Sequence, residues 1–324
     1  MTVRLPPEWA PQQWLWIGFP HDAEEWPDIL DRAQEQIAAF ASAVADSGQE
    51  VRLLVRDAAN EARARELTSA AVTLERREYG DIWLRDTGPL VREDGSALRF
   101  GFNGWGGKYV MAGDETVGAE LAANAGLSVE TADWILEGGA IDVDGAGRLV
   151  TTEECLLNPN RNPHLSREQI EQRLCERLGV SEIVWLGQGL VNDHTDGHVD
   201  NLARFVAPGA IALPRASSAD DPNRAIYEDA RERVQRTGLS VFDIPSPGAV
   251  TMGGNIVPAS YMNFAITDAL VVVPTYGSVH DEEAVAAIGE LFPTRRAVGL
   301  PADAVLAGGG SFHCASMQMP RIEA

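Results

Sequence analysis

The run Asn192-Asp-His-Thr-Asp-Gly-His-Val-Asp-Asn201 is the densest polar stretch of this chain, and it contains one of five glycine-bearing polar segments. The other four are Trp83-Leu-Arg-Asp-Thr-Gly88, Glu137-Gly-Gly139, Met252-Gly-Gly254 and Gly308-Gly-Gly310. With Gly197 as the third reference point, the last glycines of successive segments lie 51, 58, 57 and 56 residues apart. Spacing this regular indicates an internal structural repeat. We call these stretches the five glycine segments.

The sequence around each glycine segment follows the same plan. A stretch with apolar residues at helical spacing is followed by a short β-rich run. The helical stretches are 28–47, 115–125, 166–178, 223–237 and 281–291, and the β-rich runs are 51–55, 127–131, 182–186, 239–243 and 296–300. Further strand-like runs at 201–213 and 269–274 follow glycine segments. We therefore predict an α/β fold of five similar units around an axis, in one domain over residues 1–324, with the glycine segments meeting at a central site.

Composition excludes several classes of function. The chain has 324 residues, with 26 basic against 48 acidic side chains and a formal charge of −22. This balance argues against a nucleic-acid partner and favours a small cationic one. No apolar stretch is long enough to span a membrane, and no export signal is visible at the N-terminus. Three cysteines do not make a disulfide framework, so we expect a cytoplasmic protein with free thiols.

The stretch 192–201 has two chemical interpretations. On an extended strand, His194, Asp196, His198 and Asp200 would project from one face. They could be imidazole and carboxylate ligands of a hydrolytic metal site. Alternatively, one histidine is a general acid/base while the acids hold a cationic substrate. A polar network that only braces a turn is the structural alternative.

The C-terminal segment favours the second interpretation. The glycines at 309 and 310 allow the backbone to approach a ligand closely, and Cys314 follows them within one short stretch. A cysteine there suits a nucleophile that works with a distant histidine. In contrast, Cys175 falls in a helical pattern, and we predict that Cys155 is buried and packs in the core at the end of a strand.

The first two glycine segments supply further candidates. Asp86 and Asp200 could together hold a planar guanidinium, because its N–H groups can donate two parallel hydrogen bonds to one carboxylate. Glu137 is a possible third acid, and the Trp83 ring could cover the face of the cation. Arg85 fits a positioning role beside Asp86.

Nine motifs spread over nearly the whole chain resemble those of the agmatine deiminase family, also described as bacterial-type peptidyl-arginine deiminases of the guanidino-group-modifying pentein superfamily. They are 7–9, 19–22 with 25–27, 81–89, 102–109, 136–139, 151–163, 195–201, 258–264 and 308–314. The resemblance implies the five-bladed α/β propeller (pentein) fold, built of ββαβ repeats around a central active site.

The resemblance also implies roles for individual residues. Cys314 would be the nucleophile, His198 the general acid/base, and Asp86 and Asp200 the carboxylates that hold the guanidinium nitrogens. Further substrate-binding candidates are Trp83, Glu137, Asp196, His194, Gly309 and Gly310. The implied reaction is hydrolysis of agmatine to N-carbamoylputrescine and ammonia, in polyamine or arginine metabolism, through a covalent S-alkylthiouronium intermediate. It requires neither a metal nor an organic cofactor, and it is compatible with a homo-oligomer.

Three positions depart from the family pattern. His194 stands in place of an acidic residue, Ser311 in place of an asparagine, and Asp142 in place of a histidine. Because these departures could alter the pocket around the far end of the substrate, deimination of free or peptidyl arginine stays open. A manganese-dependent ureohydrolase and a silent binder of cationic metabolites are the alternatives from other classes.

Overall fold

A computed structural model of the chain describes residues 3–322 and contains five sheets of three or four strands. Four of them have the orders β4-β5-β6, β7-β8-β9, β10-β11-β12 and β15-β16-β17. Their strands are β4 (Leu90–Val91), β5 (Ser96–Gly101), β6 (Ser128–Ile135), β7 (Ile141–Val143), β8 (Arg148–Thr152), β9 (Glu182–Leu186), β10 (Arg204–Ala207), β11 (Ala210–Arg215), β12 (Ser240–Pro245), β15 (Ala265–Ile266), β16 (Leu270–Thr275) and β17 (Arg296–Pro301). In each sheet the first two strands are antiparallel and the last two parallel. The predicted α/β class is confirmed.

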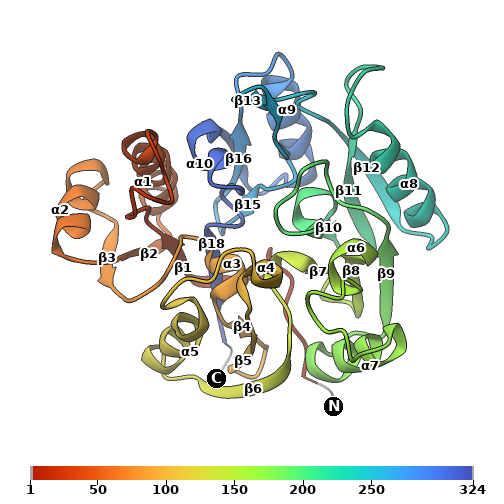
Figure 1. Cartoon of the computed structure of the whole chain (residues 1–324), viewed down its shortest axis with the longest axis horizontal. Helices are drawn as coiled ribbons and strands as arrows, with labels where there is room; N and C mark the ends of the chain where they lie inside the picture. The colour runs from red at the N-terminus through yellow and green to blue at the C-terminus, as the bar shows by residue number, and fades with distance from the viewer. Residues whose placement is uncertain (1–2, 323–324) are drawn as a thin grey trace.

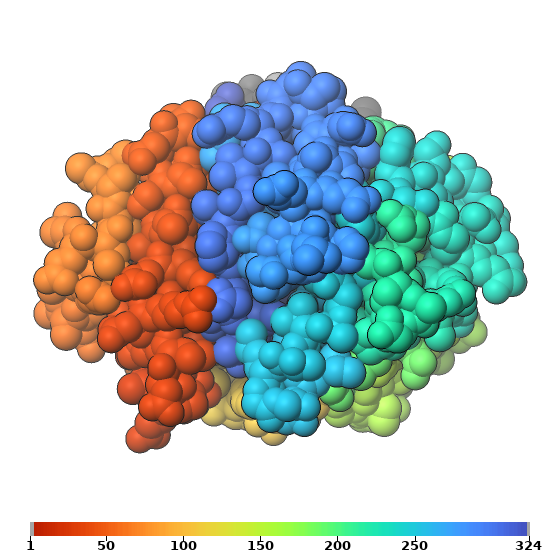
Figure 2. Space-filling view, turned by 90° about the horizontal axis from the view of Figure 1, so that it is seen from above, coloured from red at the N-terminus to blue at the C-terminus, as the bar shows by residue number. Residues whose placement is uncertain are grey.

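The fifth sheet joins the two ends of the chain. Its order is β18 (Ser316–Pro320), β1 (Gln12–Gly18), β2 (Glu50–Val55) and β3 (Thr73–Arg76). Here the antiparallel pair is β18 with β1, and the parallel pairs are β1 with β2 and β2 with β3. Figure 1 shows the sheets set around the middle of the molecule with the longer helices outside them. In Figure 2 the C-terminal part of the chain, in blue, packs directly against the N-terminal part, in red.

The parallel strands of each sheet are connected through helices, because a parallel pair needs a long crossover. These helices are α1 (Leu30–Asp46), α2 (Ala58–Leu67), α5 (Asp114–Asn124), α7 (Arg167–Leu178), α8 (Arg224–Gln235) and α9 (Asp281–Leu291). Helix α7 shows the local reasons for its length. A capping box of Ser166 and Gln169 starts it, Ile170 and Leu174 bury one face, and Gly179 ends it with a φ of 68°.

Most predicted elements agree closely with the observed ones, and three differences concern the architecture. The stretch 201–213 is not one strand but the β10–β11 hairpin, because Gly209 at a φ of 73° reverses the chain. Helix α2, which begins after the capping residue Asp57, was not predicted from the sequence. The fourth glycine segment forms a surface hairpin of β13 (Thr251–Met252) and β14 (Asn255–Ile256), so it does not meet the others.

Short helical turns place residues between the sheets and towards the middle of the fold. They are α3 (Leu84–Thr87), α4 (Gly104–Gly107), α6 (Glu153–Leu156), α10 (Asp303–Ala307) and the 3₁₀ turns η1 (Gly138–Ala140) and η2 (Val199–Asn201). Among the described residues, no helix combines the length and apolar character needed to cross a membrane.

Candidate active site

Three of the five glycine segments line one cavity of about 260 Å³. The first segment contributes Trp83 and Asp86, the third contributes His194, and the fifth contributes its three glycines. The remaining lining residues are Glu25, Pro27, Asp81, Trp105, Tyr109, Met111, Thr195, Ala307 and Cys314. These three glycine segments therefore meet at one cavity, as predicted. The second segment packs against their polar side chains on the side away from the cavity.

Cys314 is 95% buried. Asn263 Nδ2 donates a hydrogen bond to its Sγ at 3.0 Å, and the Cys314 amide donates to Asn263 Oδ1 at 3.2 Å. Burial, followed by the charges of Asp200 and Asp86, raises the pKa of the Cys314 thiol well above its ordinary value. The thiol is therefore neutral before a cation enters the cavity.

Residue-level reasoning did not find Asn263. It lies in the 258–264 motif, directly before β15, and the tertiary structure brings it to Cys314 across 51 residues. The motif was the available indication, but an asparagine has no chemistry that singles it out in a sequence.

Asp86 is held by two donors at the edge of the cavity. Trp105 Nε1 donates to Oδ2 at 2.9 Å, and the Gly139 amide donates to Oδ1 at 2.9 Å. Helix α3 carries Asp86, and the amide of its neighbour Arg85 donates to the Cys314 carbonyl at 2.9 Å. These bonds fix the carboxylate relative to the thiol. Arg85 itself is buried and donates from Nη1 to Gln318.

Asp200 is fully buried on η2, with Oδ2 lying 3.4 Å from Cys314 Sγ. The same oxygen lies 2.7 Å from His313 Nδ1. Burial alone would raise the pKa of Asp200, but His313 and other nearby cations lower it. Its Oδ1 has no hydrogen-bond partner among the described residues. Asp200 is thus an ionised acceptor beside the thiol.

His198 is fully buried, and its Nδ1 lies 3.7 Å from Asp86 Oδ1. Burial alone would lower the pKa of His198, but the Asp86 charge and contacts with Cys155 and Glu137 raise it well above its ordinary value. The protonated ring is therefore favoured, and neither of its nitrogens has a hydrogen-bond partner among the described residues.

Gly139 lets three of these side chains converge. A Cβ at this position would lie 2.6 Å from His198 Nδ1, 2.9 Å from Asp86 Oδ1 and 3.2 Å from Asp200 Oδ2. The first two distances are shorter than any relaxed contact of a methyl group. The second glycine segment therefore supplies close approach and a backbone donor.

Glu137, expected in the substrate pocket, is placed behind His198. It is fully buried, its Oε1 accepts from Arg161 Nε at 2.6 Å, and it is not among the described residues that line the cavity. Cys155 lies on the short helix α6 rather than at a strand end, and it is fully buried next to His198.

The four-residue face predicted for 192–201 is wrong. Asn192 and Asp196 both have a φ of 62°, and Asp193 Oδ1 accepts from the amide and the hydroxyl of Thr195, so the segment forms turns. These turns send His194 to the exposed mouth of the cavity while His198 and Asp200 become buried. Asp196 leaves the cavity and binds Lys108 and Arg161.

The metal interpretation of this stretch therefore loses its donor set. Among the described residues, the only three donors close enough to share an ion are Glu137, Cys155 and His198, which lie within 4.8 Å of one another. Arg161 binds Glu137 Oε1 while Oε2 has no hydrogen-bond partner among the described residues, and burial raises the pKa of the Cys155 thiol. This arrangement favours a charged histidine over a metal ligand.

The mouth of the cavity is aromatic and acidic. The Tyr109 and His194 rings lie 6.1 Å apart, and Glu25 and Asp81 contribute carboxyl groups. Burial raises the pKa of Asp81 to about 6. A Cβ at Gly310 would lie 2.6 Å from the Trp83 ring, so this glycine allows the tryptophan to form a wall.

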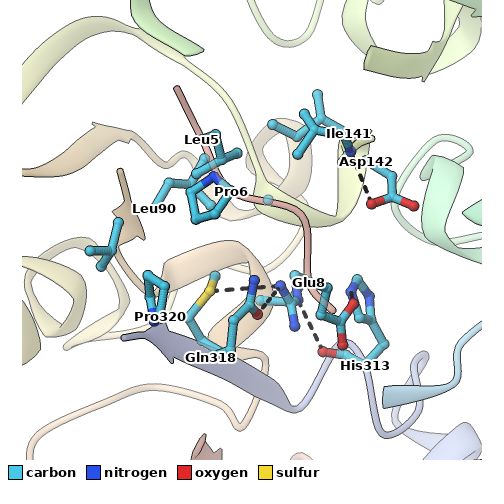
Figure 3. A pocket seen from close by; sticks show the side chains of 14 residues that line it. Leu5, Pro6, Glu8, Leu90, Ile141, Asp142, His313, Gln318 and Pro320 are labelled. Carbon is cyan, nitrogen blue, oxygen red and sulfur yellow. Dashed lines mark hydrogen bonds and ion pairs between the residues drawn. The ribbon is translucent and has the colours of Figure 1, made fainter. Parts of the chain in front are cut away.

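The three departures from the family pattern lie in different surroundings. His194 is at the mouth, and Ser311 is buried beside the glycines. Asp142 accepts from the Phe205 amide at 2.7 Å and lines a second, smaller cavity of about 40 Å³ (Figure 3). Only His194 can therefore meet the far end of a ligand in the larger cavity.

The chain is similar to known proteins over nearly its whole length. The model of the Porphyromonas-type peptidyl-arginine deiminase family matches residues 4–320. The agmatine deiminase of Stutzerimonas stutzeri is 38% identical over 357 residues, covering 98% of this chain and 95% of the relative. The solved agmatine deiminase of Enterococcus faecalis superposes with a TM-score of 0.93 at 31% identity, covering 99% and 96% of the two chains.

A C. jejuni agmatine deiminase variant solved with substrate bound has a TM-score of 0.92 at 29% identity, covering 98% of this chain and 96% of that one. These matches run over nearly the full length of both partners, and they confirm the resemblance and the pentein-type fold. The chain belongs to the Porphyromonas-type peptidyl-arginine deiminase family.

Proposed function

We propose that this protein hydrolyses agmatine to N-carbamoylputrescine and ammonia, with Cys314 as the nucleophile. The observation that carries the proposal is the burial of one thiol close to two carboxylates, Asp86 and Asp200, with the buried His198 ring 3.7 Å from Asp86. Its full-length relatives are described as agmatine deiminases, one of them with substrate bound.

The carboxylates would hold the guanidinium group. Its planar N–H groups can donate paired hydrogen bonds to carboxylate oxygens. The two buried acids also compensate for the hydration that the cation loses when it leaves water. Asp86 is oriented by Trp105 and Gly139, and Asp200 has an Oδ1 without a partner among the described residues. The Trp83 ring would cover one face of the cation.

The same cation would activate the nucleophile. In the empty cavity the carboxylates raise the pKa of Cys314, and a bound guanidinium would oppose their charge. Substrate binding would thus favour loss of the thiol proton to solvent. The thiolate would form only when its electrophile is in place.

The first chemical step would join Cys314 Sγ to the central guanidinium carbon. His198 would then donate its proton to one NH₂ group, the C–N bond would break, and ammonia would leave. The S-alkylthiouronium cation would remain on Cys314, and His198 would be neutral.

The second step would use water in place of the lost amine. Neutral His198 would take a proton from a water molecule while the oxygen of that water bonds to the central carbon of the intermediate. Breaking the C–S bond would regenerate the thiolate and release the ureido product, with the remaining proton passing to solvent. One water is consumed and one ammonia is formed.

The lining of the cavity favours agmatine over free arginine. Its described lining residues include Glu25, Asp81 and Asp86 but no arginine or lysine. The primary amine of agmatine suits this acidic wall, whereas the carboxylate of arginine would lack a cationic partner. A ureohydrolase would leave Cys314 unused, and a silent binder would have no need of it.

We also propose that the chain acts as one catalytic domain in the cytoplasm, on a small cationic substrate and without nucleic-acid or membrane partners. Pairing of β18 with β1 supports the single domain, and three free cysteines support a reducing compartment. Residues 1–2 and 323–324 of the proposed domain lie outside the described residues. A homo-oligomer is compatible with this proposal.

Product analysis tests the reaction and the substrate together. Purified, chelator-treated protein is given agmatine, free arginine and a blocked peptidyl arginine in parallel. Ammonia and N-carbamoylputrescine from agmatine alone are expected. Urea would support the ureohydrolase, and ammonia only from an arginine substrate would overturn the assignment of agmatine. Thermal stabilisation by agmatine without turnover would identify a binder.

A further inference from the structure

A buried carboxylate from the N-terminal end of the chain reaches the residue next to the nucleophile. Glu8 precedes β1, and its Oε2 lies 3.1 Å from His313 Nε2. On the other side of the ring, His313 Nδ1 lies 2.7 Å from Asp200 Oδ2. All three side chains are at least nine-tenths buried. Figure 3 shows Glu8 and His313 side by side at the wall of the small cavity.

These contacts place a carboxylate oxygen within hydrogen-bond distance of each ring nitrogen of His313. An ionised carboxylate can only accept hydrogen bonds, so two carboxylate neighbours require the imidazole to donate from both nitrogens. Burial would raise the pKa of Glu8, but Arg204 and His313 lower it far below its ordinary value. The pKa of Asp200 is lowered as well. Both neighbours are therefore ionised acceptors, one at each ring nitrogen of His313.

Other charges surround this pair of contacts. His198, Arg204 and Cys314 face Asp200. Asp142 faces His313, and Arg85 Nε donates to the His313 carbonyl at 3.3 Å. Among these groups, His313 has the shortest hydrogen-bond contact with Asp200, so it opposes the burial penalty of that carboxylate most directly.

We propose that His313, held by Glu8, is a positioning residue that keeps Asp200 ionised and oriented for the substrate guanidinium. This inference rests on the proposed function, because it assigns Asp200 to substrate binding. It extends the active site to a segment more than 300 residues away from Cys314 in sequence. Without His313, the burial of Asp200 would be less opposed, and the carboxyl group would take up a proton at higher pH.

Two variants and one control test the proposal. His313→Gln removes the ring, and Glu8→Gln keeps the shape of the side chain while removing its charge. Asp144→Asn is the control, since Asp144 is a fully buried carboxylate that accepts from Ala146 and Arg148 amides outside the site. The readouts are kcat/KM for agmatine against pH and, in a Cys314→Ala background, agmatine affinity against pH.

We expect the acid limb of both profiles to move to higher pH. The shift should be at least about one pH unit in His313→Gln and smaller, in the same direction, in Glu8→Gln. The control should leave the limb in place even if it lowers the melting temperature. A uniform loss at every pH with an unmoved limb in both variants would overturn the proposal, because that is the behaviour of a purely structural role.

A measurement on the unmodified protein covers the case in which the variants do not fold. Nitrogen NMR of the histidine rings should show His313 protonated at both nitrogens at neutral pH, and a neutral ring there would refute the inference. Failure of the proposed function looks different. In that case the Cys314→Ala protein would not bind agmatine at any pH, while the charge state of His313 would be unaffected.

Discussion

The floor and the mouth of the cavity are built in opposite ways. At the floor, Cys314 lines the cavity and His198 and Asp200 lie behind it. All three are at least 95% buried, and fixed donors such as Trp105 and Asn263 orient the groups around them. At the mouth, His194 is exposed and sits on a turn. A buried group can be held in one charge state, whereas an exposed one is screened by solvent. The difference indicates that the floor sets the reaction and the mouth tunes which guanidine is preferred.

The largest effect should come from removing the thiol at the floor. Cys314→Ala should lower ammonia release from agmatine by at least about 10⁴-fold, since no other group can form the covalent intermediate. Agmatine should still raise the melting temperature of this variant, because the carboxylates remain. Cys175→Ala, on the partly exposed side of α7, is the control and should keep its activity. Substantial turnover by Cys314→Ala would refute the mechanism.

Neutralising a floor carboxylate should separate thiol reactivity from catalysis. Asp86→Asn should lower kcat/KM by about 10²- to 10³-fold through loss of a guanidinium contact. The Asp86 charge contributes to the raised pKa of Cys314, so its removal should lower that pKa. Alkylation of Cys314 by iodoacetamide at neutral pH should then become faster than in the unmodified protein.

The alkylation rate is followed by mass spectrometry of the peptide that contains Cys314, which distinguishes it from Cys155 and Cys175. In the unmodified protein the rate should keep rising with pH beyond the range where an ordinary thiol has levelled off. Slower or unchanged alkylation in Asp86→Asn would show that the carboxylates do not hold the thiol in its neutral form.

A single methyl group should disturb the floor more than any change at the mouth. Gly139→Ala places a Cβ within 2.6 Å of His198 Nδ1, so the histidine must move away from Asp86. We expect kcat to fall by more than about 10-fold, as displacement of a catalytic group by a fraction of an ångström does. Gly289→Ala on α9, whose added Cβ would meet Ala297 Cβ at 3.1 Å, should keep its activity. Equal activity of the two variants would contradict this prediction.

The smallest effect is expected at the mouth. His194→Glu restores the acidic residue of the family pattern and adds a negative charge near the far end of the cavity. KM for agmatine should fall a few-fold while kcat stays the same, because exposed charges interact weakly through water. Steady-state kinetics with agmatine and arginine would check this. A large change in kcat would mean that the mouth takes part in the chemistry.

The sequence alone determined the features of this protein that depend on residues close together in the chain. The five units follow from the periodicity of apolar residues and from glycines that end helices and strands. The capping box at the start of α7 is an example of a helix boundary set by neighbouring residues. Cys314 and the two aspartates were identifiable because thiol and carboxylate chemistry is intrinsic to those residue types, whereas only the family resemblance singled out His198 rather than His194. Their motifs also carried the family resemblance.

The tertiary structure decided which groups come together. Period-two alternation predicted one face for His194 and His198, but Asp193 bonds and two left-handed residues separate them. The Asp196-Gly197 pair is a local turn signal, but it does not tell which histidine becomes buried. Asn263 and Glu8 reach the site from 51 and 306 residues before Cys314, through pairing of distant strands and a buried ion pair. Burial then set the charges of the thiol and the histidine, because the cost of burying a charge depends on every neighbour in space rather than on those in sequence.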